Sequence, residues 1–321
     1  MKVDTSLDSG DTKMSGTGEA NVKSFFLNVC SNADLSPAIA AMMTLMELLR
    51  LDDSKTLVEL IEKMRKARES LTQTDVSLVS VSSGCELFVR FITLAHAELE
   101  QATDFSSVRD ILLKRGEKFI STMQESRKKI VHHSMNLIKD GMVILTHSRS
   151  RCVLAAMREA AKQGRQFSVY VTESQPDCEG KKMVEELAAE KIPVTMILDA
   201  AVGYIMERVT CVMVGAEGVC ENGGIINKIG SCSMATLAHL KNKPVYVLVE
   251  SFKFIRTIPL NNSSLPKNYL HRYSVLSTNS EIHSEHPMVD YTHPDNITLL
   301  YTDVGIIPTS AVTEYLIKLY T

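Results

Sequence analysis

The 321-residue chain has no uninterrupted apolar run of about 18 residues, the length that a membrane-spanning helix needs. Its first residues also lack the basic-then-apolar order of a signal peptide. We therefore expect a protein that neither spans a membrane nor is secreted by that route. The balance of 35 Lys and Arg against 38 Asp and Glu leaves no basic excess, which argues against a DNA-binding protein that neutralises phosphates.

The chain also lacks any C-x-x-C spacing among its seven cysteines, an odd number scattered along the sequence. This usage favours reduced thiols and a cytosolic protein. The pair His283 and His286 has metal-ligand spacing, but the segment lacks a helical pattern and further ligands nearby, so we expect no metal. The chain is 45% hydrophobic, which is ordinary for a globular protein, and its length suggests about two domains.

The first half of the sequence is poor in glycine and reads as helical. Residues 1–20 are rich in Ser, Thr, Gly and Asp, and we expect them to form a disordered tail. Residues 21–140 contain about five amphipathic helical patterns and are predicted to form a helical domain, to which the resemblance described below assigns a regulatory role. One helix is predicted to begin at Ser36-Pro37, with Ser36 as N-cap, and to continue with apolar residues at helical spacing.

After Gly141 short apolar runs alternate with helix-length amphipathic segments. Continuous Val, Ile and Leu runs are typical of strands buried on both faces. Residues 141–321 are therefore predicted to form a Rossmann-like α/β domain with a doubly wound, mostly parallel sheet. Residues 261–295 are rich in Pro, Asn, Ser and His, and we expect an excursion or hairpin before the last strand.

Ligands of such sheets bind beyond the carboxyl ends of the strands. The segment 215–230 follows a predicted strand and holds five of the chain's 15 glycines. Glycine lets backbone amides approach a ligand, and Asn227 and Lys228 offer a donor and a cation that suit phosphate. A structural crossover with tight turns explains the glycines equally well at this point.

Three further loops carry polar groups at predicted strand ends. The first is Thr146-His-Ser-Arg-Ser-Arg151, whose arginines and hydroxyl groups at a helix N-terminus favour an anion, although Ser148 or Ser150 would also serve as a simple helix cap. Glu173 and Asp199 follow the next two strands. We expect the four loops to share one pocket.

Several long motifs, in the same order, resemble one known family. They are Ile144–His147, Val171–Pro176, Gly215–Val219, Glu221–Gly230 and Glu250–Phe254. This set resembles the family that joins the regulatory subunits of translation initiation factor 2B to the aldose-phosphate isomerases. The segments Ser82–Phe91 and Leu316–Tyr320 resemble one class of those regulatory subunits. The resemblance runs from about Asn21 to the C-terminus and implies the two-part fold predicted above.

The resemblance also bears on catalysis. The family's isomerases act on methylthioribose 1-phosphate or ribose 1,5-bisphosphate, with a cysteine and an aspartate that move the proton. Ser148 and Glu217 stand at those positions, and Gln175 stands where the isomerases tend to carry an arginine. A serine hydroxyl is a far weaker acid than a thiol, and one added methylene displaces the carboxylate. We therefore expect no enzyme activity. The alternative is an active aldose-phosphate isomerase in which these catalytic groups have been replaced.

The resemblance implies a regulatory role in protein synthesis. It suggests a non-catalytic subunit of the guanine nucleotide exchange factor for initiation factor 2, a homodimer that joins beta, gamma, delta and epsilon subunits in the cytosol. Such a subunit helps to sense the phosphorylated alpha subunit of initiation factor 2 under stress. Because other family positions match, a sugar-phosphate ligand is retained as a candidate, and no other cofactor is expected. The candidate pocket comprises Thr146, His147, Ser148, Arg149, Glu173, Asp199, Glu217, Asn227 and Lys228.

Overall fold

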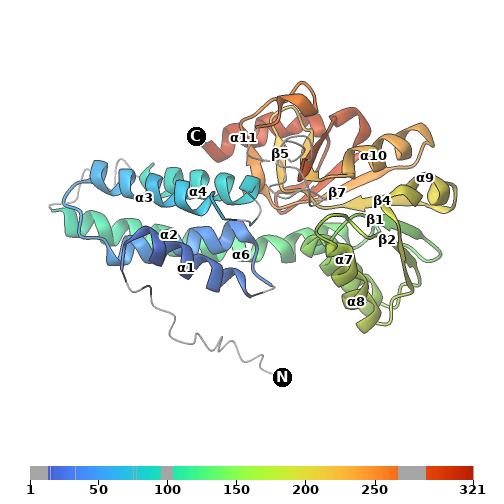
Figure 1. The fold of residues 1–321 in the computed structure, drawn as a ribbon, viewed down its shortest axis with the longest axis horizontal. Coiled ribbons are helices and arrows are strands. Elements are labelled where there is room, and N and C mark those ends of the chain that lie inside the picture. The colour runs from blue at the N-terminus through green and yellow to red at the C-terminus, as the bar shows by residue number, and fades with distance from the viewer. Residues whose placement is uncertain are drawn as a thin grey trace, which may run out of the picture. The chain divides into compact units, whose positions relative to one another are not determined.

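The computed structural model describes residues 14, 16–32, 34–74, 76, 78–94, 104–266 and 287–320. The chain divides into two compact units, Met1–Ser121 and Thr122–Thr321, and the long helix α6 (Phe105–Ser134) contains the division (Figure 1). The sequence-based boundary at residues 140 and 141 lies later, between α6 and the first strand. Most of the predicted tail, 1–20, lies outside the described residues. No helix among the described residues combines the length and apolar character required to cross a bilayer.

The described part of the first unit is helical, as its patterning predicts. Its elements are α1 (Glu19–Cys30), α2 (Pro37–Leu51), α3 (Leu57–Leu71), α4 (Leu78–Thr93) and the first part of α6. Helix α2 begins where predicted, because the Ser36 hydroxyl accepts a hydrogen bond from the Ile39 amide at 3.3 Å. Gly84 lets α4 approach α2 closely, since a Cβ atom there would lie 2.9 Å from the Ala38 Cβ.

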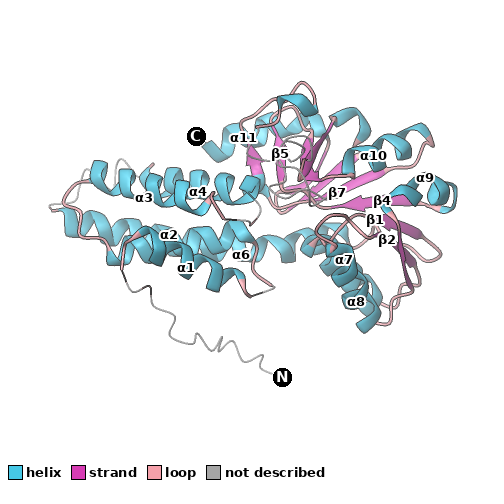
Figure 2. Ribbon diagram, in the orientation of Figure 1, coloured by secondary structure: helices cyan, strands magenta, loops and turns pink. Residues whose placement is uncertain are grey.

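The second unit is built on a seven-stranded sheet in the order β11-β10-β7-β4-β1-β2-β3 (Figure 2). All neighbouring pairs are parallel except the β10–β11 pair at one edge. The order reverses direction at β1, as in a doubly wound sheet, so the predicted fold class is confirmed. The strands are β1 (Val143–Thr146), β2 (Ser168–Thr172), β3 (Val194–Ile197), β4 (Cys211–Val214), β7 (Val245–Leu248), β10 (Leu299–Thr302) and β11 (Gly305–Ile307).

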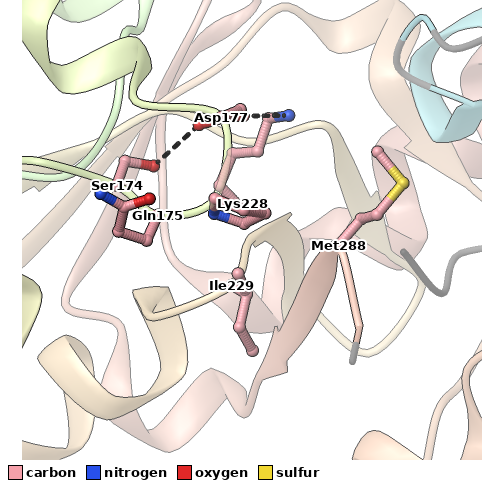
Figure 3. Close-up of a pocket in the computed structure, with 7 residues that line it drawn as sticks. Ser174, Gln175, Asp177, Lys228, Ile229 and Met288 are labelled. Atoms are coloured by element: carbon pink, nitrogen blue, oxygen red, sulfur yellow. Dashed lines mark hydrogen bonds and ion pairs between the residues drawn. The ribbon is translucent and has the colours of Figure 1, made fainter. Parts of the chain in front are cut away.

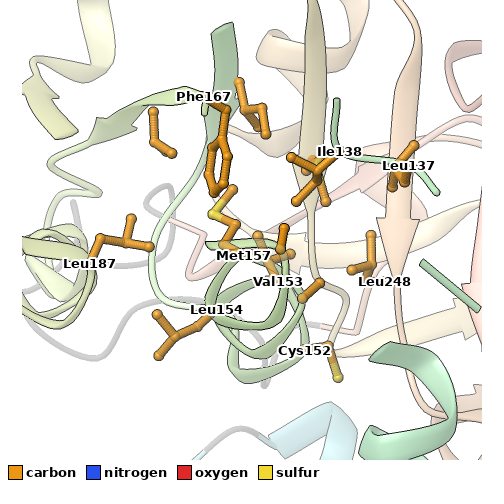
Figure 4. Close-up of a cluster of buried hydrophobic side chains, with 14 of the residues drawn as sticks. Leu137, Ile138, Cys152, Val153, Leu154, Met157, Phe167, Leu187 and Leu248 are labelled. Carbon is orange, nitrogen blue, oxygen red and sulfur yellow. The ribbon is translucent and has the colours of Figure 1, made fainter. Parts of the chain in front are cut away.

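Helices cover this sheet on both faces, with α7 and α8 on one side and α10 on the other (Figure 1). Helix α7 buries Val153 and Met157 against Phe167 and strand residues of the sheet (Figure 4). The Ser150 hydroxyl accepts from the Val153 amide at 3.4 Å, so Ser150 is the cap of α7. The helices are α7 (Arg151–Lys162), α8 (Glu179–Ala189), α9 (Val202–Ile205), α10 (Ser231–Leu240) and α11 (Val312–Tyr320).

A second, four-stranded sheet is the main feature that the sequence did not predict. Its order is β8-β5-β6-β9, and its strands are β8 (Phe254–Ile255), β5 (Gly218–Cys220), β6 (Ile225–Lys228) and β9 (Val289–Thr292). The glycine-rich segment is thus a β5–β6 hairpin in place of an open loop. Its glycines have packing reasons: Gly223 adopts φ +84° in the turn, and a Cβ on Gly224 would lie 2.5 Å from the Tyr291 ring. The predicted excursion 261–295 contributes β9, and its residues 267–286 lie outside the described part of the chain.

Candidate functional site

The loops after β1, β2 and β4 meet near the point where the strand order reverses, which is where doubly wound sheets bind ligands. A small pocket lies in this region, with about 250 Å³ of empty space when the open solvent at its mouth is included and about 20 Å³ for the centres of water-sized molecules. One wall comes from the loop after β2 and the other from the end of β6 and the start of β9 (Figure 3). Its lining residues are Ser174, Gln175, Pro176, Asp177, Lys228, Ile229 and Met288.

Lys228 is the cation of this pocket and is held by two carboxylates. Its Nζ lies 2.7 Å from Asp177 Oδ2 and 3.8 Å from Glu217 Oε1. Burial alone would lower the pKa of Lys228, but the carboxylates of Glu217 and Asp177 outweigh it and raise that pKa. Lys228 is therefore charged at neutral pH, and its charge is already compensated within the protein.

His147 supports the pocket wall and does not line the pocket. Its Nε2 lies 2.7 Å from the Ile229 carbonyl, which can only accept, so Nε2 carries the proton. Its Nδ1 then accepts from the Thr172 hydroxyl at 2.6 Å. Burial lowers the pKa of His147, although Asp199 opposes this, and the ring is neutral near pH 7. Both ring nitrogens are used, so His147 fixes the end of β1 to the residue after β6.

The other residues of the first loop are also placed inside the protein. Thr146 is fully buried, and its hydroxyl has no hydrogen-bond partner in the part of the chain that the structure describes. Ser148 is 4% exposed and adopts a left-handed backbone conformation, φ 57°. The Arg149 guanidinium makes a bidentate pair with Glu186 of α8, at 2.7 and 2.8 Å. Arg149 is therefore engaged by a carboxylate and does not line the pocket.

Glu173 and Asp199 join the loops after β2 and β3. The Asp199 carboxylate accepts from the amides of Ser174 at 3.0 Å and Gln175 at 2.7 Å. Glu173 Oε1 in turn accepts from the Asp199 amide at 3.4 Å. These carboxylates hold the start of the pocket loop, so their role in the structure is positioning.

Asn227 and the Asp290 carboxylate lie on paired positions of β6 and β9 and face the start of α10. The Asn227 amide donates to the Ser231 hydroxyl at 2.9 Å. Asp290 Oδ2 accepts from the amides of Gly230 at 2.7 Å and Cys232 at 3.0 Å, while Oδ1 is buried without a partner among the described residues. Burial raises the pKa of Asp290 to about 7, although both amides favour the ionised form.

Of the nine predicted residues, the structure places Lys228 in the pocket lining and Glu217 against it. The others support its walls or lie in neighbouring contacts. Sequence reasoning did not select Asp177, which ends the same loop as Glu173, or Met288, which lies in the excursion. Hydroxyl, amide and ammonium groups line the pocket beside a carboxylate, a set suited to a small hydroxylated ligand.

Comparisons with known proteins agree on one family. The model of the initiation factor 2 subunit family matches residues 32–309. The chain is 42% identical over 302 residues to translation initiation factor eIF2B subunit alpha of Caenorhabditis elegans, covering 94% of this chain and 99% of that protein. It is 39% identical over 298 residues to the same subunit of Dictyostelium discoideum, covering 89% and 92%.

More distant relatives include an enzyme and solved structures. Ribose 1,5-bisphosphate isomerase of Archaeoglobus fulgidus is 30% identical over 259 residues, with 77% of each chain covered. The crystal structure of Pyrococcus horikoshii OT3 translation initiation factor eIF-2B is 25% identical with a TM-score of 0.70, covering 88% of this chain and 96% of that one. A chain of the tetrameric eIF2B-beta2-delta2 complex from C. thermophilum shares the fold, with TM-score 0.74 at 19% identity, covering 94% and 95%. The resemblance drawn from the motifs is thus confirmed: the chain belongs to the initiation factor 2 subunit family, and within it resembles the eIF2B alpha subunits.

Proposed function

We propose that this chain is a non-catalytic, alpha-type regulatory subunit of the guanine nucleotide exchange factor eIF2B, acting in the cytosol. The observation that carries the proposal is the 42% identity to an eIF2B alpha subunit across 94% of this chain and 99% of that protein. Its partners are then the beta, gamma, delta and epsilon subunits and the phosphorylated alpha subunit of initiation factor 2. The test is to purify the tagged chain from cell extract, size the complex and identify the associated chains. Recovery of the chain alone would contradict the proposal.

Two features of the site support a regulatory role over an isomerase reaction. Ser148 is a buried serine where the family's isomerases have a cysteine, and a hydroxyl there exchanges protons poorly at neutral pH. The Glu217 carboxylate lies 3.8 Å from the Lys228 ammonium and is engaged in that ion pair. We expect no turnover of ribose 1,5-bisphosphate above that of a Ser148→Ala variant. Turnover well above that control would favour the isomerase alternative.

Self-association would use the β3 edge of the seven-stranded sheet. Met196 and Leu198 are 50% and 62% exposed at this edge, and Tyr204 of α9, which follows β3 in the chain, is 77% exposed. Exposed apolar side chains of this kind mark contact surfaces. The apolar stretch Cys211–Cys220 is mostly buried within the chain and packs its core, so it is not available for this contact. We expect light scattering to give a dimer. Leu198→Asp should weaken it, while Ile306→Asp at the opposite sheet edge should not.

The pocket would take a sugar phosphate, with hydroxyl groups near the carboxylates and the phosphate on Lys228. A ligand that binds only the folded protein raises its stability by about 2.7 kcal/mol at a hundredfold excess over Kd. A panel of sugar phosphates should therefore raise the melting temperature of the wild-type chain. Absence of any shift across the panel would leave the pocket without this role.

A further inference from the structure

Asp177 occupies the position that an anionic ligand of the pocket would need. Its carboxylate lies 2.7 Å from the Lys228 ammonium, and both side chains line the same pocket (Figure 3). Lys228 is the only cationic side chain among the lining residues that the structure describes. An anion that enters the pocket must therefore compete with Asp177 for the same three N–H donors.

The charge around Lys228 makes this competition strong. With Asp177 at 2.7 Å and Glu217 at 3.8 Å, the ammonium faces two carboxylates before any ligand arrives. The three side chains are 27%, 31% and 13% exposed for Lys228, Asp177 and Glu217, so water screens them only in part. A phosphate brought next to an unmoved Asp177 would meet like charge at short distance.

Asp177 has other donors that can hold it once it leaves Lys228. Its Oδ1 accepts from the Glu179 amide at 3.3 Å and from the Ser174 hydroxyl at 3.4 Å. Glu179 is the first residue of α8, and the N-terminus of a helix favours a carboxylate. The amides of Ser174 and Gln175 are fixed by Asp199, so the first part of the loop can stay in place while the Asp177 side chain turns.

We propose that Asp177 is a built-in competitor for the phosphate group of the pocket's ligand, which must displace this carboxylate from Lys228 to bind. The inference rests on the proposed sugar-phosphate pocket and adds its regulation. Ligand binding would then change the start of α8, because the freed carboxylate would be held only by the Glu179 amide and the Ser174 hydroxyl that it already contacts. Ligand binding in the pocket would thus alter the surface at the start of α8.

The experiment measures binding of ribose 5-phosphate and of inorganic phosphate to the full chain by calorimetry. The test variant is Asp177→Asn, which keeps the shape of the side chain and an acceptor for the Glu179 amide. The matched control is Glu179→Gln, which removes the same charge from the same helix start. Glu179 acts on Lys228 more weakly than Asp177 does, through its charge, and forms its ion pair with Lys182 at 2.5 Å. Unliganded melting curves of all variants establish that they are folded.

We expect Asp177→Asn to bind ribose 5-phosphate about tenfold more tightly than the wild type, a factor typical of coupled, partly buried charges. Glu179→Gln should change affinity by much less. Saturating ligand should also alter hydrogen exchange at residues 177–181 in the wild type. Binding by the wild type with no gain in Asp177→Asn would overturn this inference alone. If a folded Asp177→Asn binds neither probe, both the inference and the sugar-phosphate pocket are overturned. If Asp177→Asn gains affinity for inorganic phosphate alone, Asp177 is a competitor for phosphate, but the pocket does not recognise the sugar.

Discussion

The buried carboxylate of Asp290 should make the stability of this protein fall between pH 4 and pH 7. Burial raises its pKa from 3.8 to about 7 in the folded chain. The folded protein therefore binds more protons than the unfolded chain in this interval, and its free energy of unfolding decreases as pH rises. At about 1.4 kcal/mol per pKa unit, the ionisation of Asp290 costs roughly 4 kcal/mol once pH exceeds 7. This figure already includes the opposing effect of the Gly230 and Cys232 amides at the start of α10.

The perturbation that isolates this cost is Asp290→Asn. An amide has nearly the shape of a protonated carboxyl group and keeps an acceptor for the amides of Gly230 and Cys232. We expect the variant to match the wild type within about 1 kcal/mol in urea unfolding at pH 4.5. At pH 8 it should be the more stable protein, by about 1 kcal/mol or more. An equal difference between the two proteins at both pH values would refute the reasoning, because a merely structural effect does not depend on pH.

Two further predictions concern Lys228 and the hairpin residue Gly224. Lys228→Ala should lower the free energy of unfolding by about 1–2 kcal/mol in the absence of ligand, a value between those for exposed and buried ion pairs. Urea unfolding at pH 7 measures this change, and a variant as stable as the wild type would contradict the prediction. Gly224→Ala should cost about 2 kcal/mol or more, because its Cβ would lie 2.5 Å from the Tyr291 ring. Gly203→Ala is its control, since its Cβ meets nothing nearer than 3.9 Å; equal thermal stability of the two variants would contradict the packing argument.

The parts of the fold that local sequence determines could be predicted. Strands β1, β2, β4 and β7 have apolar runs, and Ser36 caps its helix as expected. The edge strand β3 differs: Thr195 and Met196 are exposed there, because no strand of the described residues pairs with its outer side. The second sheet escaped prediction because β6 pairs with β9, which lies far along the chain, and because β6 lacks an alternation of apolar and polar residues.

The arrangement of charges in the candidate site could likewise be predicted only in part from the sequence. The sequence places Lys228 in a glycine-rich segment, and a lysine there predicts a phosphate ligand. The β5–β6 hairpin then brings Glu217 of the same segment to this ammonium, and the loop after β2 adds Asp177. Spacing along the chain carries no information about the contact with Asp177, because that contact depends on how β2 and β6 lie in space. A ligand of this pocket must therefore either present hydroxyl groups to the carboxylates or displace one of them, and the affinity of the site depends on Asp177 as much as on Lys228.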